Sequence, residues 1–243
     1  MHLSSDPATI GALASGGLDS CVLVAHLLQQ GRGVQPFYVR CGLVWEPEEL
    51  DALQAFLQAI ASPGLQELIV FDLPLADLYA DHWSLSGRGA PDADSADDAV
   101  YLPGRNALLT IKPAIWCAMH NIDQLALAIL AGNPFADATD AFFTELEAML
   151  ATAAGSPIAI LRPFAKLTKP QVIELGRGLP LELTFSCIAP RDGQPCGQCN
   201  KCAERQRAFR SVGIVDPTRY ATPALVPSPI GTPRVSPLPW GER

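Results

Sequence analysis

Apolar residues fall into two alternating patterns along the chain. Short continuous apolar runs are typical of buried strands, and apolar residues three or four positions apart are typical of helices. Five runs predict strands, at residues 10–14, 34–39, 68–71, 124–130 and 159–161. Four periodic segments predict helices, at residues 18–28, 47–60, 105–119 and 142–150. This alternation predicts an α/β fold, a Rossmann-like parallel sheet covered on both faces, with functional residues beyond the carboxyl ends of its strands.

A turn of small residues joins the first predicted strand to the first helix. Its sequence is Ser15-Gly16-Gly17-Leu18-Asp19-Ser20. The two glycines have no Cβ, so this backbone can approach a phosphate closely. Helix N–H groups and the serine hydroxyls would add donors, and the helix dipole favours an anion. The Walker pattern, which ends in Gly-Lys-Ser/Thr, is absent from the chain. The turn predicts a phosphate site, with a tight turn that binds no ligand as the alternative.

Four cysteines near the C-terminus have the spacing of a metal site, C-x8-C-x2-C-x2-C. They are Cys187, Cys196, Cys199 and Cys202. Two-residue gaps let neighbouring thiolates bind one ion, and a loop that returns to a fourth completes a tetrahedral zinc site. Because the protein supplies all four ligands, such a site is structural and has no open position for a water. An iron–sulfur cluster, a redox dithiol and unrelated cysteines are the alternatives to zinc.

Composition favours an enzyme that acts on small molecules. The 243 residues carry a net charge of −8, which argues against a general nucleic-acid surface. No uncharged run reaches the roughly 18 residues that span a bilayer, so we expect no membrane contact. The first residues lack the basic and apolar regions of an export signal. Metal-type cysteine spacing fits a reducing compartment, and we expect a cytoplasmic protein.

Composition also divides the chain into regions. Residues 222–243 hold six prolines with little periodicity, so we expect an extended or disordered tail. The remaining patterns predict an α/β domain over residues 1–184 and a zinc-binding motif over residues 185–221.

The motifs together resemble one enzyme family. The turn at residues 15–20 resembles the pyrophosphate loop of the ATP pyrophosphatase superfamily, which has an adenine nucleotide alpha hydrolase-like fold and splits ATP between its α and β phosphates. Further segments occur in the order found in 7-cyano-7-deazaguanine synthases. These segments are Tyr101-Leu102-Pro103-Gly104-Arg105-Asn106, Lys169 with Ile173-Glu174-Leu175-Gly176, Thr184-Phe185-Ser186-Cys187 and residues 196–202.

This resemblance implies an ATP-dependent C–N ligase of queuosine-type deazapurine biosynthesis. In that family 7-carboxy-7-deazaguanine, ammonia and ATP give the nitrile. The carboxylate is adenylated and displaced by ammonia to an amide, and the amide oxygen is then adenylated and leaves with AMP. The resemblance implies ATP, Mg²⁺ and structural Zn²⁺ as cofactors, with release of AMP and pyrophosphate. It also implies a homodimer without a nucleic-acid partner.

The resemblance also implies roles for individual residues. Adenylation concentrates negative charge on the α-phosphate and pyrophosphate, so fixed donors and cations there lower the barrier. The pyrophosphate would be held by Ser15, Gly16, Gly17, Leu18, Asp19 and Ser20. Asp19 would also hold Mg²⁺ or orient the loop. Arg105 and Lys169 would neutralise phosphate oxygens, with exposed surface cations as the alternative. Asn106 and Asp137 are assigned to the substrate, and Asn106 also fits a capping or buried amide.

One segment departs from the family pattern. The family usually carries Tyr-Pro-Asp-Cys-Arg-Pro after the fourth strand, where this chain has Phe135-Ala136-Asp137-Ala138-Thr139-Asp140. The acid is kept as Asp137, but the Cys and Arg equivalents are absent. Asp137 could accept hydrogen bonds from a guanine-like edge, and a helix-capping carboxylate is the alternative. The segment leaves open which acid is the substrate.

Three other functions fit parts of the sequence. A divergent member could adenylate another carboxylate, stop at the amide or join the acid to a macromolecule. A tRNA thiolation enzyme of the same superfamily would need reactive cysteines and a basic surface. A zinc-ribbon binding module would explain the cysteines but not the turn at residues 15–20.

Overall fold

The computed structural model describes residues 9–221, and its centre is one parallel sheet. The strand order is β3-β2-β1-β4-β5, so the direction of winding changes between β1 and β4. The strands are β1 (Thr9–Leu13), β2 (Gly33–Arg40), β3 (Ile69–Asp72), β4 (Gln124–Ala126) and β5 (Ala159–Leu161). The expected Rossmann-like sheet is confirmed.

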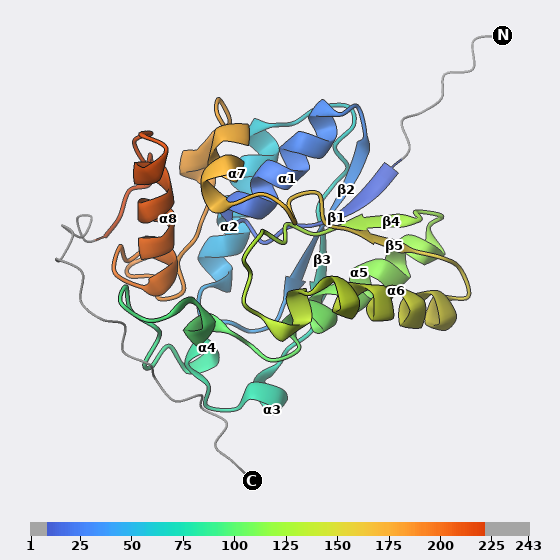
Figure 1. Cartoon of the computed structure of the whole chain (residues 1–243), viewed down its shortest axis with the longest axis horizontal. Helices are drawn as coiled ribbons and strands as arrows, with labels where there is room; N and C mark the ends of the chain where they lie inside the picture. The colour runs from blue at the N-terminus through green and yellow to red at the C-terminus, as the bar shows by residue number, and fades with distance from the viewer. Residues whose placement is uncertain (1–8, 222–243) are drawn as a thin grey trace.

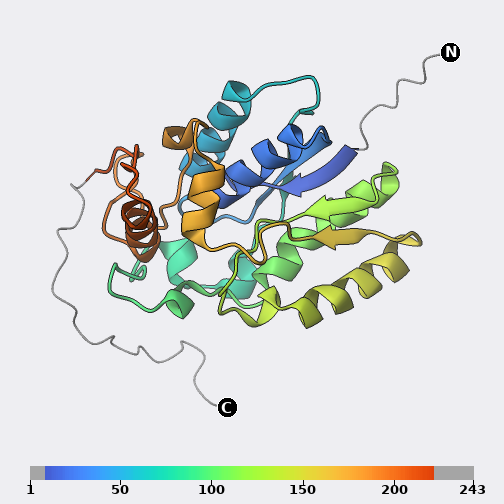
Figure 2. The same cartoon turned by 45° about the horizontal axis from the view of Figure 1, so that its top comes forward.

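Helices cover both faces of the sheet (Figures 1 and 2). One face carries α1 (Leu18–Gln29), α2 (Glu46–Ala59) and α7 (Lys169–Leu175), and the other carries α5 (Arg105–Met119) and α6 (Asp140–Ala154). Strand residues alternate between the two apolar cores. Tyr38 belongs to the core under α1 and α2, whereas its neighbour Phe37 belongs to the core under α5 and α6.

A third core joins the C-terminal region to the sheet. Helix α8 (Asn200–Ser211) follows the cysteine-rich turns at one end of the molecule (Figure 1). The four cysteines pack in one apolar cluster with Val39, Trp45, Leu102 and Phe185. The domain boundary expected at residue 184 stays a prediction, and the expected Pro-rich tail lies outside the described residues. Within residues 9–221, no helix is long and apolar enough to cross a membrane.

Shorter elements connect these layers, and one strand differs from its expected length. They are α3 (Ala76–Tyr79), α4 (Trp83–Ser86) and the 3₁₀ turns η1 (Asp97–Val100), η2 (Ala136–Ala138) and η3 (Leu181–Leu183). β4 ends at Ala126, four residues before the end of the apolar run (124–130) that predicts it. Leu127 still donates its N–H to the Leu161 carbonyl at 2.9 Å, but the residues after it line a cavity at the sheet edge.

Candidate nucleotide site and metal centre

The turn between β1 and α1 is held together by its own serines. Ser15 donates its N–H to Ser20 Oγ at 3.1 Å, and Ser20 Oγ donates to the Gly17 carbonyl at 3.0 Å. Gly16 has a φ of +80°, and a Cβ there would lie 2.2 Å from the Glu49 carbonyl oxygen. Gly17 has an extended backbone with φ −68°. The loop conformation therefore requires glycine at position 16.

A cavity of about 240 Å³ opens between this loop and the carboxyl ends of β1, β2 and β4. Four residues predicted for the site line it, namely Ser15, Ser20, Arg105 and Asn106. Arg105 Nε is buried and has no hydrogen-bond partner among the described residues. Since guanidinium groups only donate, this N–H suits an anion such as a phosphate. The cavity is the candidate nucleotide site.

Two much larger cavities lie elsewhere among the described residues and contain none of the predicted phosphate-binding residues. One of about 570 Å³ lies between α2 and residues 182–185, and one of about 830 Å³ lies at the amino ends of the strands. In parallel α/β sheets ligands bind beyond the carboxyl ends of the strands. The smaller cavity therefore fits a nucleotide better than either of the larger ones.

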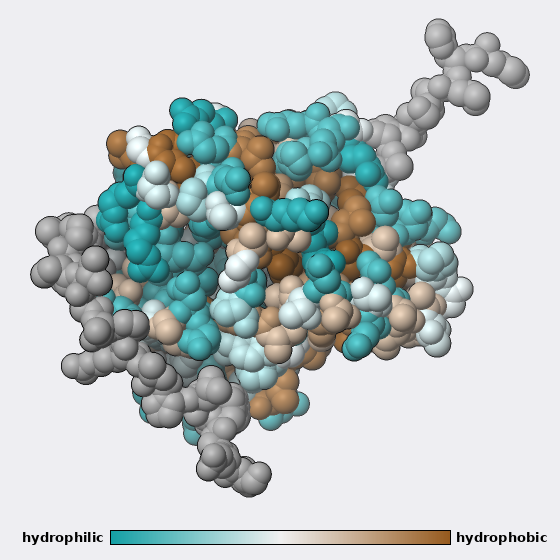
Figure 3. Space-filling view, in the orientation of Figure 1, coloured by the Kyte–Doolittle hydropathy of each residue, from teal (hydrophilic) through white to brown (hydrophobic). Residues whose placement is uncertain are grey.

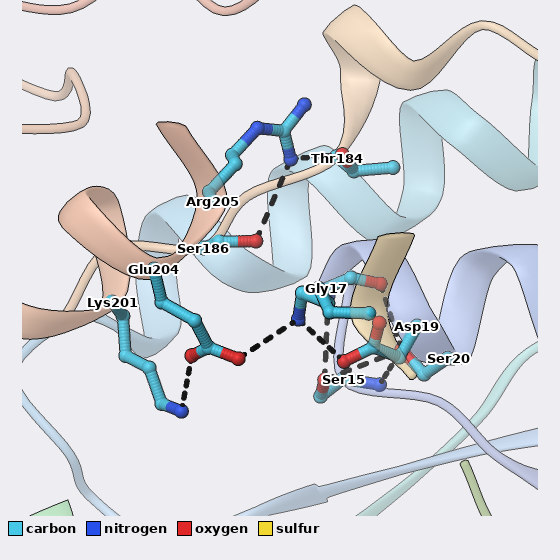
Figure 4. A network of polar contacts seen from close by, with 10 residues as sticks. Ser15, Gly17, Asp19, Ser20, Thr184, Ser186, Lys201, Glu204 and Arg205 are labelled. Atoms are coloured by element: carbon cyan, nitrogen blue, oxygen red, sulfur yellow. Dashed lines mark hydrogen bonds and ion pairs between the residues drawn. The ribbon is translucent and has the colours of Figure 1, made fainter. Parts of the chain in front are cut away.

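Asp19 belongs to the loop and Lys169 lies beside it, and neither residue lines the nucleotide cavity. Lys169 Nζ is 2.6 Å from Asp19 Oδ2 and 3.6 Å from Glu204 Oε1. Lys201 binds the other oxygen of Glu204 at 2.6 Å, and Figure 4 shows these two side chains facing one another near the loop. The ion pairs join α1, α7 and α8 into one charge network.

Burial and charge oppose one another in this network. Burial alone would lower the pKa of Lys169, but Asp19 and Glu204 raise it, so the ammonium keeps its proton. Burial would raise the pKa of Glu204, yet Lys169 and Lys201 outweigh it and lower that pKa to about 2. Asp19 Oδ1 is buried and has no partner among the described residues.

Asp137 and Asn106 bind one another. Asn106 donates its N–H to Asp137 Oδ2 and its Nδ2–H to the Asp137 carbonyl, both at 2.9 Å. Burial raises the pKa of Asp137, opposed by the hydrogen bonds from Asn106. The carboxylate thus accepts a hydrogen bond from a free N–H group at the start of α5, the helix that carries Arg105. The substrate roles of both residues stay predictions.

The four cysteines form a compact, buried group. Their Sγ atoms all lie within 4.8 Å of one another, with Cys187 and Cys199 3.8 Å apart and Cys196 and Cys202 4.0 Å apart. A tetrahedral ion with Zn–S bonds of about 2.3 Å separates its sulfurs by roughly 3.8 Å, so this donor set fits zinc. The N–H of Cys196 also donates to Cys187 Sγ at 3.2 Å, which favours a thiolate.

Several residues that build the site were not predicted from the sequence. Arg205 is 1% exposed and donates to Thr184 Oγ1 at 2.6 Å and to Asp216 Oδ1 at 3.1 Å, and Figure 4 shows it reaching Thr184 and Ser186. Tyr38 and Glu49 line the nucleotide cavity. Glu49 could have been suspected, because it opens the helix after β2 and functional residues gather at this sheet edge.

The loop between α4 and α5 is hydrogen-bonded to the segment that holds the four cysteines. Asn200 donates its N–H to the Pro91 carbonyl at 3.0 Å and its Nδ2–H to the Ser95 carbonyl at 2.9 Å. Asp92 pairs with the metal-ligand candidate Cys199 as an antiparallel bridge. The same loop continues into Leu102 of the third core and then into Arg105.

Fold and site together define a Rossmann-like α/β protein with a glycine-containing loop after β1 and a buried four-cysteine cluster. The family model described as "Queuosine biosynthesis protein QueC" matches residues 10–213. The chain belongs to this family, which confirms the resemblance noted from its motifs.

Relatives and one distant structure can be compared with the chain. The 7-cyano-7-deazaguanine synthase of Pseudomonas fluorescens (strain SBW25) is 32% identical over 219 residues, 86% of this chain and 96% of that protein. The synthase of the same name from Methanopyrus kandleri is 32% identical over 88% of this chain and 99% of that protein. A solved 4-thiouridine synthetase–RNA complex with bound ATP has 15% identity and a TM-score of 0.46, covering 84% of this chain and 50% of that chain.

Proposed function

We propose that this protein uses ATP to convert 7-carboxy-7-deazaguanine and ammonia into 7-cyano-7-deazaguanine, with release of AMP and pyrophosphate. Family membership and the names of the relatives support the product. The nucleotide cavity supports the use of ATP. There Ser15 and Ser20 share a wall with Arg105, whose buried Nε lacks a protein partner among the described residues.

The loop and its neighbours divide the work of binding ATP. The N–H groups at the start of α1 and the serine hydroxyls donate to the pyrophosphate, while Arg105 neutralises charge on the α-phosphate. Asp19 Oδ1, which has no partner among the described residues, would serve as an oxygen ligand for Mg²⁺, and the ion would offset charge on the phosphates. Lys169 holds Asp19 in place through their ion pair and adds positive charge beside the loop.

The reaction needs two activations by the same groups. In the first, a carboxylate oxygen attacks the α-phosphorus and pyrophosphate leaves. Ammonia then forms the C–N bond, the C–O bond to AMP breaks, and one proton is lost. In the second, the amide oxygen is adenylated, and loss of AMP with two amide protons gives the nitrile. Positioned donors and cations stabilise the charge that develops at each α-phosphate.

Zinc, partners and location complete the proposal. The four cysteines hold structural Zn²⁺, whose binding stabilises the third core and leaves no ligand position open for chemistry. Small molecules are the partners, in keeping with the net charge of −8 and pI of about 4.9. A homodimer and a cytoplasmic location are predictions from the family resemblance and composition.

Product analysis tests this function. Purified protein is incubated with ATP, Mg²⁺, ammonia and 7-carboxy-7-deazaguanine, and products are followed by mass spectrometry. We expect the nitrile together with AMP and pyrophosphate. Arg105→Gln should lower turnover by roughly 10²-fold, the usual effect of removing a charge-stabilising donor, whereas exposed Arg177→Gln should leave it unchanged. ADP and phosphate as the only nucleotide products would contradict the proposal.

A divergent amide ligase is the second candidate. The stretch Phe135–Asp140 lacks the Cys and Arg equivalents of the family pattern, and this difference favours a changed substrate. Accumulation of the amide alone, or consumption of ATP only with another acid, would replace nitrile synthesis by this activity. A tRNA thiolation enzyme would instead show freely titrating cysteines without bound zinc.

Asp137→Asn separates a substrate role from a structural one. If Asp137 reads the substrate, the variant should lose about 1–3 kcal/mol of substrate recognition while ATP affinity is kept. The buried contact with Asn106 gives the competing expectation of a weaker α5 start and a rise in the KM for ATP. Steady-state KM values for both substrates measure this split, with Asp140→Asn on the exposed face as the control.

A further inference from the structure

Three acidic residues open helix α2, and each has different surroundings. Glu46 is buried and accepts the N–H groups of Cys41 at 2.6 Å and Gly42 at 2.7 Å, so it fixes the turn after β2. Glu48 lines the separate cavity between α2 and residues 182–185. Glu49 lines the nucleotide cavity together with Ser15 and Arg105. One turn of helix thus presents a carboxyl group to the candidate site.

The position of Glu49 is fixed from two sides. Its carbonyl oxygen packs against Gly16 of the loop, at the place where a Cβ would clash. Its carboxylate accepts one hydrogen bond from the described residues, from the Tyr38 hydroxyl at 3.1 Å. A single hydrogen bond leaves lone pairs of the carboxylate available to a bound molecule.

The surroundings move the pKa of the Glu49 carboxyl into the range where the group gains and loses its proton. Burial raises its pKa to about 8, opposed by the positive charge of Arg105 and the hydrogen bond from Tyr38, and assisted by the negative charge of Glu46. The thiols of Cys21 and Cys41 are nearby and are themselves kept protonated by burial. A carboxyl group of this kind gains and loses a proton near neutral pH.

We propose that Glu49 is the group that accepts the proton when ammonia attacks the adenylated carboxylate. The inference rests on the proposed function. As the nitrogen bonds to the acyl carbon and the C–O bond to AMP breaks, one N–H proton passes to the Glu49 carboxylate, and water later removes it. Amide, AMP and protonated Glu49 are the products, so atoms and charge balance.

The other ionisable groups near the cavity are unsuited to this role. Among the residues that line it, only Tyr38, Glu49 and Arg105 ionise. The guanidinium of Arg105 only donates hydrogen bonds, and burial raises the pKa of Tyr38 further above neutrality. Outside the lining, Asp19 is paired with Lys169 and Asp137 with Asn106. Glu49 is therefore the carboxylate placed to receive the proton.

The test separates adenylation from amine attack. Glu49→Gln keeps the size and the Tyr38 contact but accepts no proton, and Glu48→Gln is the matched control one residue away. Adenylation is followed as acid-dependent exchange of labelled pyrophosphate into ATP. Amine attack is followed as hydroxamate formation with hydroxylamine, which is unprotonated at neutral pH, so that its own ionisation does not mask that of Glu49.

We expect Glu49→Gln to keep exchange within about threefold of wild type and to lower hydroxamate formation by roughly 10²-fold, the usual contribution of a general base. The rise of the wild-type hydroxamate rate toward pH 8 should be lost in this variant and kept in Glu48→Gln. Retained exchange also shows that the variant is folded.

Three outcomes overturn the assignment. An unchanged hydroxamate rate with an unchanged pH profile removes the proton-transfer role. Loss of exchange in folded Glu49→Gln, or a raised Mg²⁺ requirement for exchange, assigns the residue to ATP or metal binding instead. Wild-type protein that neither exchanges pyrophosphate nor forms hydroxamate overturns the proposed function itself, and the assignment with it.

Discussion

Gly16 lies where three segments of the molecule meet. Its carbonyl accepts the Phe185 N–H at 2.8 Å, and its Cα faces the Glu49 carbonyl with no room for a side chain. Gly31 has a similar φ of +75°, but a Cβ there would have no neighbour within 4 Å. The two glycines therefore separate the cost of backbone conformation from the cost of a steric clash.

We expect Gly16→Ala to lower the free energy of unfolding by about 1–3 kcal/mol more than Gly31→Ala does. In both variants alanine in the left-handed conformation costs roughly 1–2 kcal/mol. Only Gly16→Ala also forces Glu49 away from the loop. Urea denaturation measures the difference, and pyrophosphate exchange should fall in Gly16→Ala alone. Equal destabilisation of both variants would contradict the steric argument.

Residue chemistry could be predicted from the sequence where it is local. The loop at residues 15–20 and the cysteine spacing depend on neighbours along the chain, and the structure places the four thiols together. Glu49 and Arg205 were not predicted, because their partners are brought to them only by folding. Asp137 shows the same limit, since its partner Asn106 is 31 positions away in the chain.

At the scale of elements, charges tie three helices together. Asp19 of α1, Lys169 of α7 and Glu204 of α8 form a continuous chain of ion pairs that ends at Lys201. No periodicity in the sequence predicts such a chain, because it joins separate helices. The strands were easier to predict, except that apolar character extends past the end of β4 into the cavity wall.

We expect Glu204→Gln to lower the free energy of unfolding at pH 7 by about 1.5–3 kcal/mol, the range for hydrogen bonds to charged groups. The folded pKa of Glu204 is about 2, below its ordinary value of 4.5, so its contribution is complete above pH 4.5 and is lost as the pH falls toward 2. Denaturation at pH 7, 5 and 3 should show the difference from wild type shrinking. Glu174→Gln, in an exposed pair, is the control and should cost less than about 1 kcal/mol.

At the scale of the whole molecule, the four cysteines belong to the core that joins the C-terminal region to the sheet. Its cysteines pack with Val39 from β2 and with Leu102, just before α5. In the space-filling view, the surface over α8 is largely hydrophilic, whereas apolar residues lie toward the middle of the same face (Figure 3). The centre is thus internal, and we expect it to stabilise the fold.

Purified protein should contain about one zinc ion per chain, since the four thiols form one tetrahedral donor set. Cys199→Ser should lose the metal and lower both the folded yield and the midpoint of urea denaturation, because metal binding at such a site is also folding free energy. Cys117→Ala, outside the cluster, should keep its zinc. Metal analysis and denaturation of chelator-treated wild type complete the test, and unchanged stability without metal would contradict it.

The carboxyl ends and the amino ends of the strands in the parallel sheet differ in how well they tolerate sequence changes. Every group assigned to the nucleotide cavity lies at the carboxyl ends of the strands or on a helix that begins there. Within residues 9–221, the opposite end of the strands carries the returns from helices to strands, such as the turn after α6 at Gly155, where a Cβ would meet nothing within 4 Å. Fluorescent labels, affinity tags or inserted domains are therefore best placed in that turn, where the chain can be opened without disturbing catalysis.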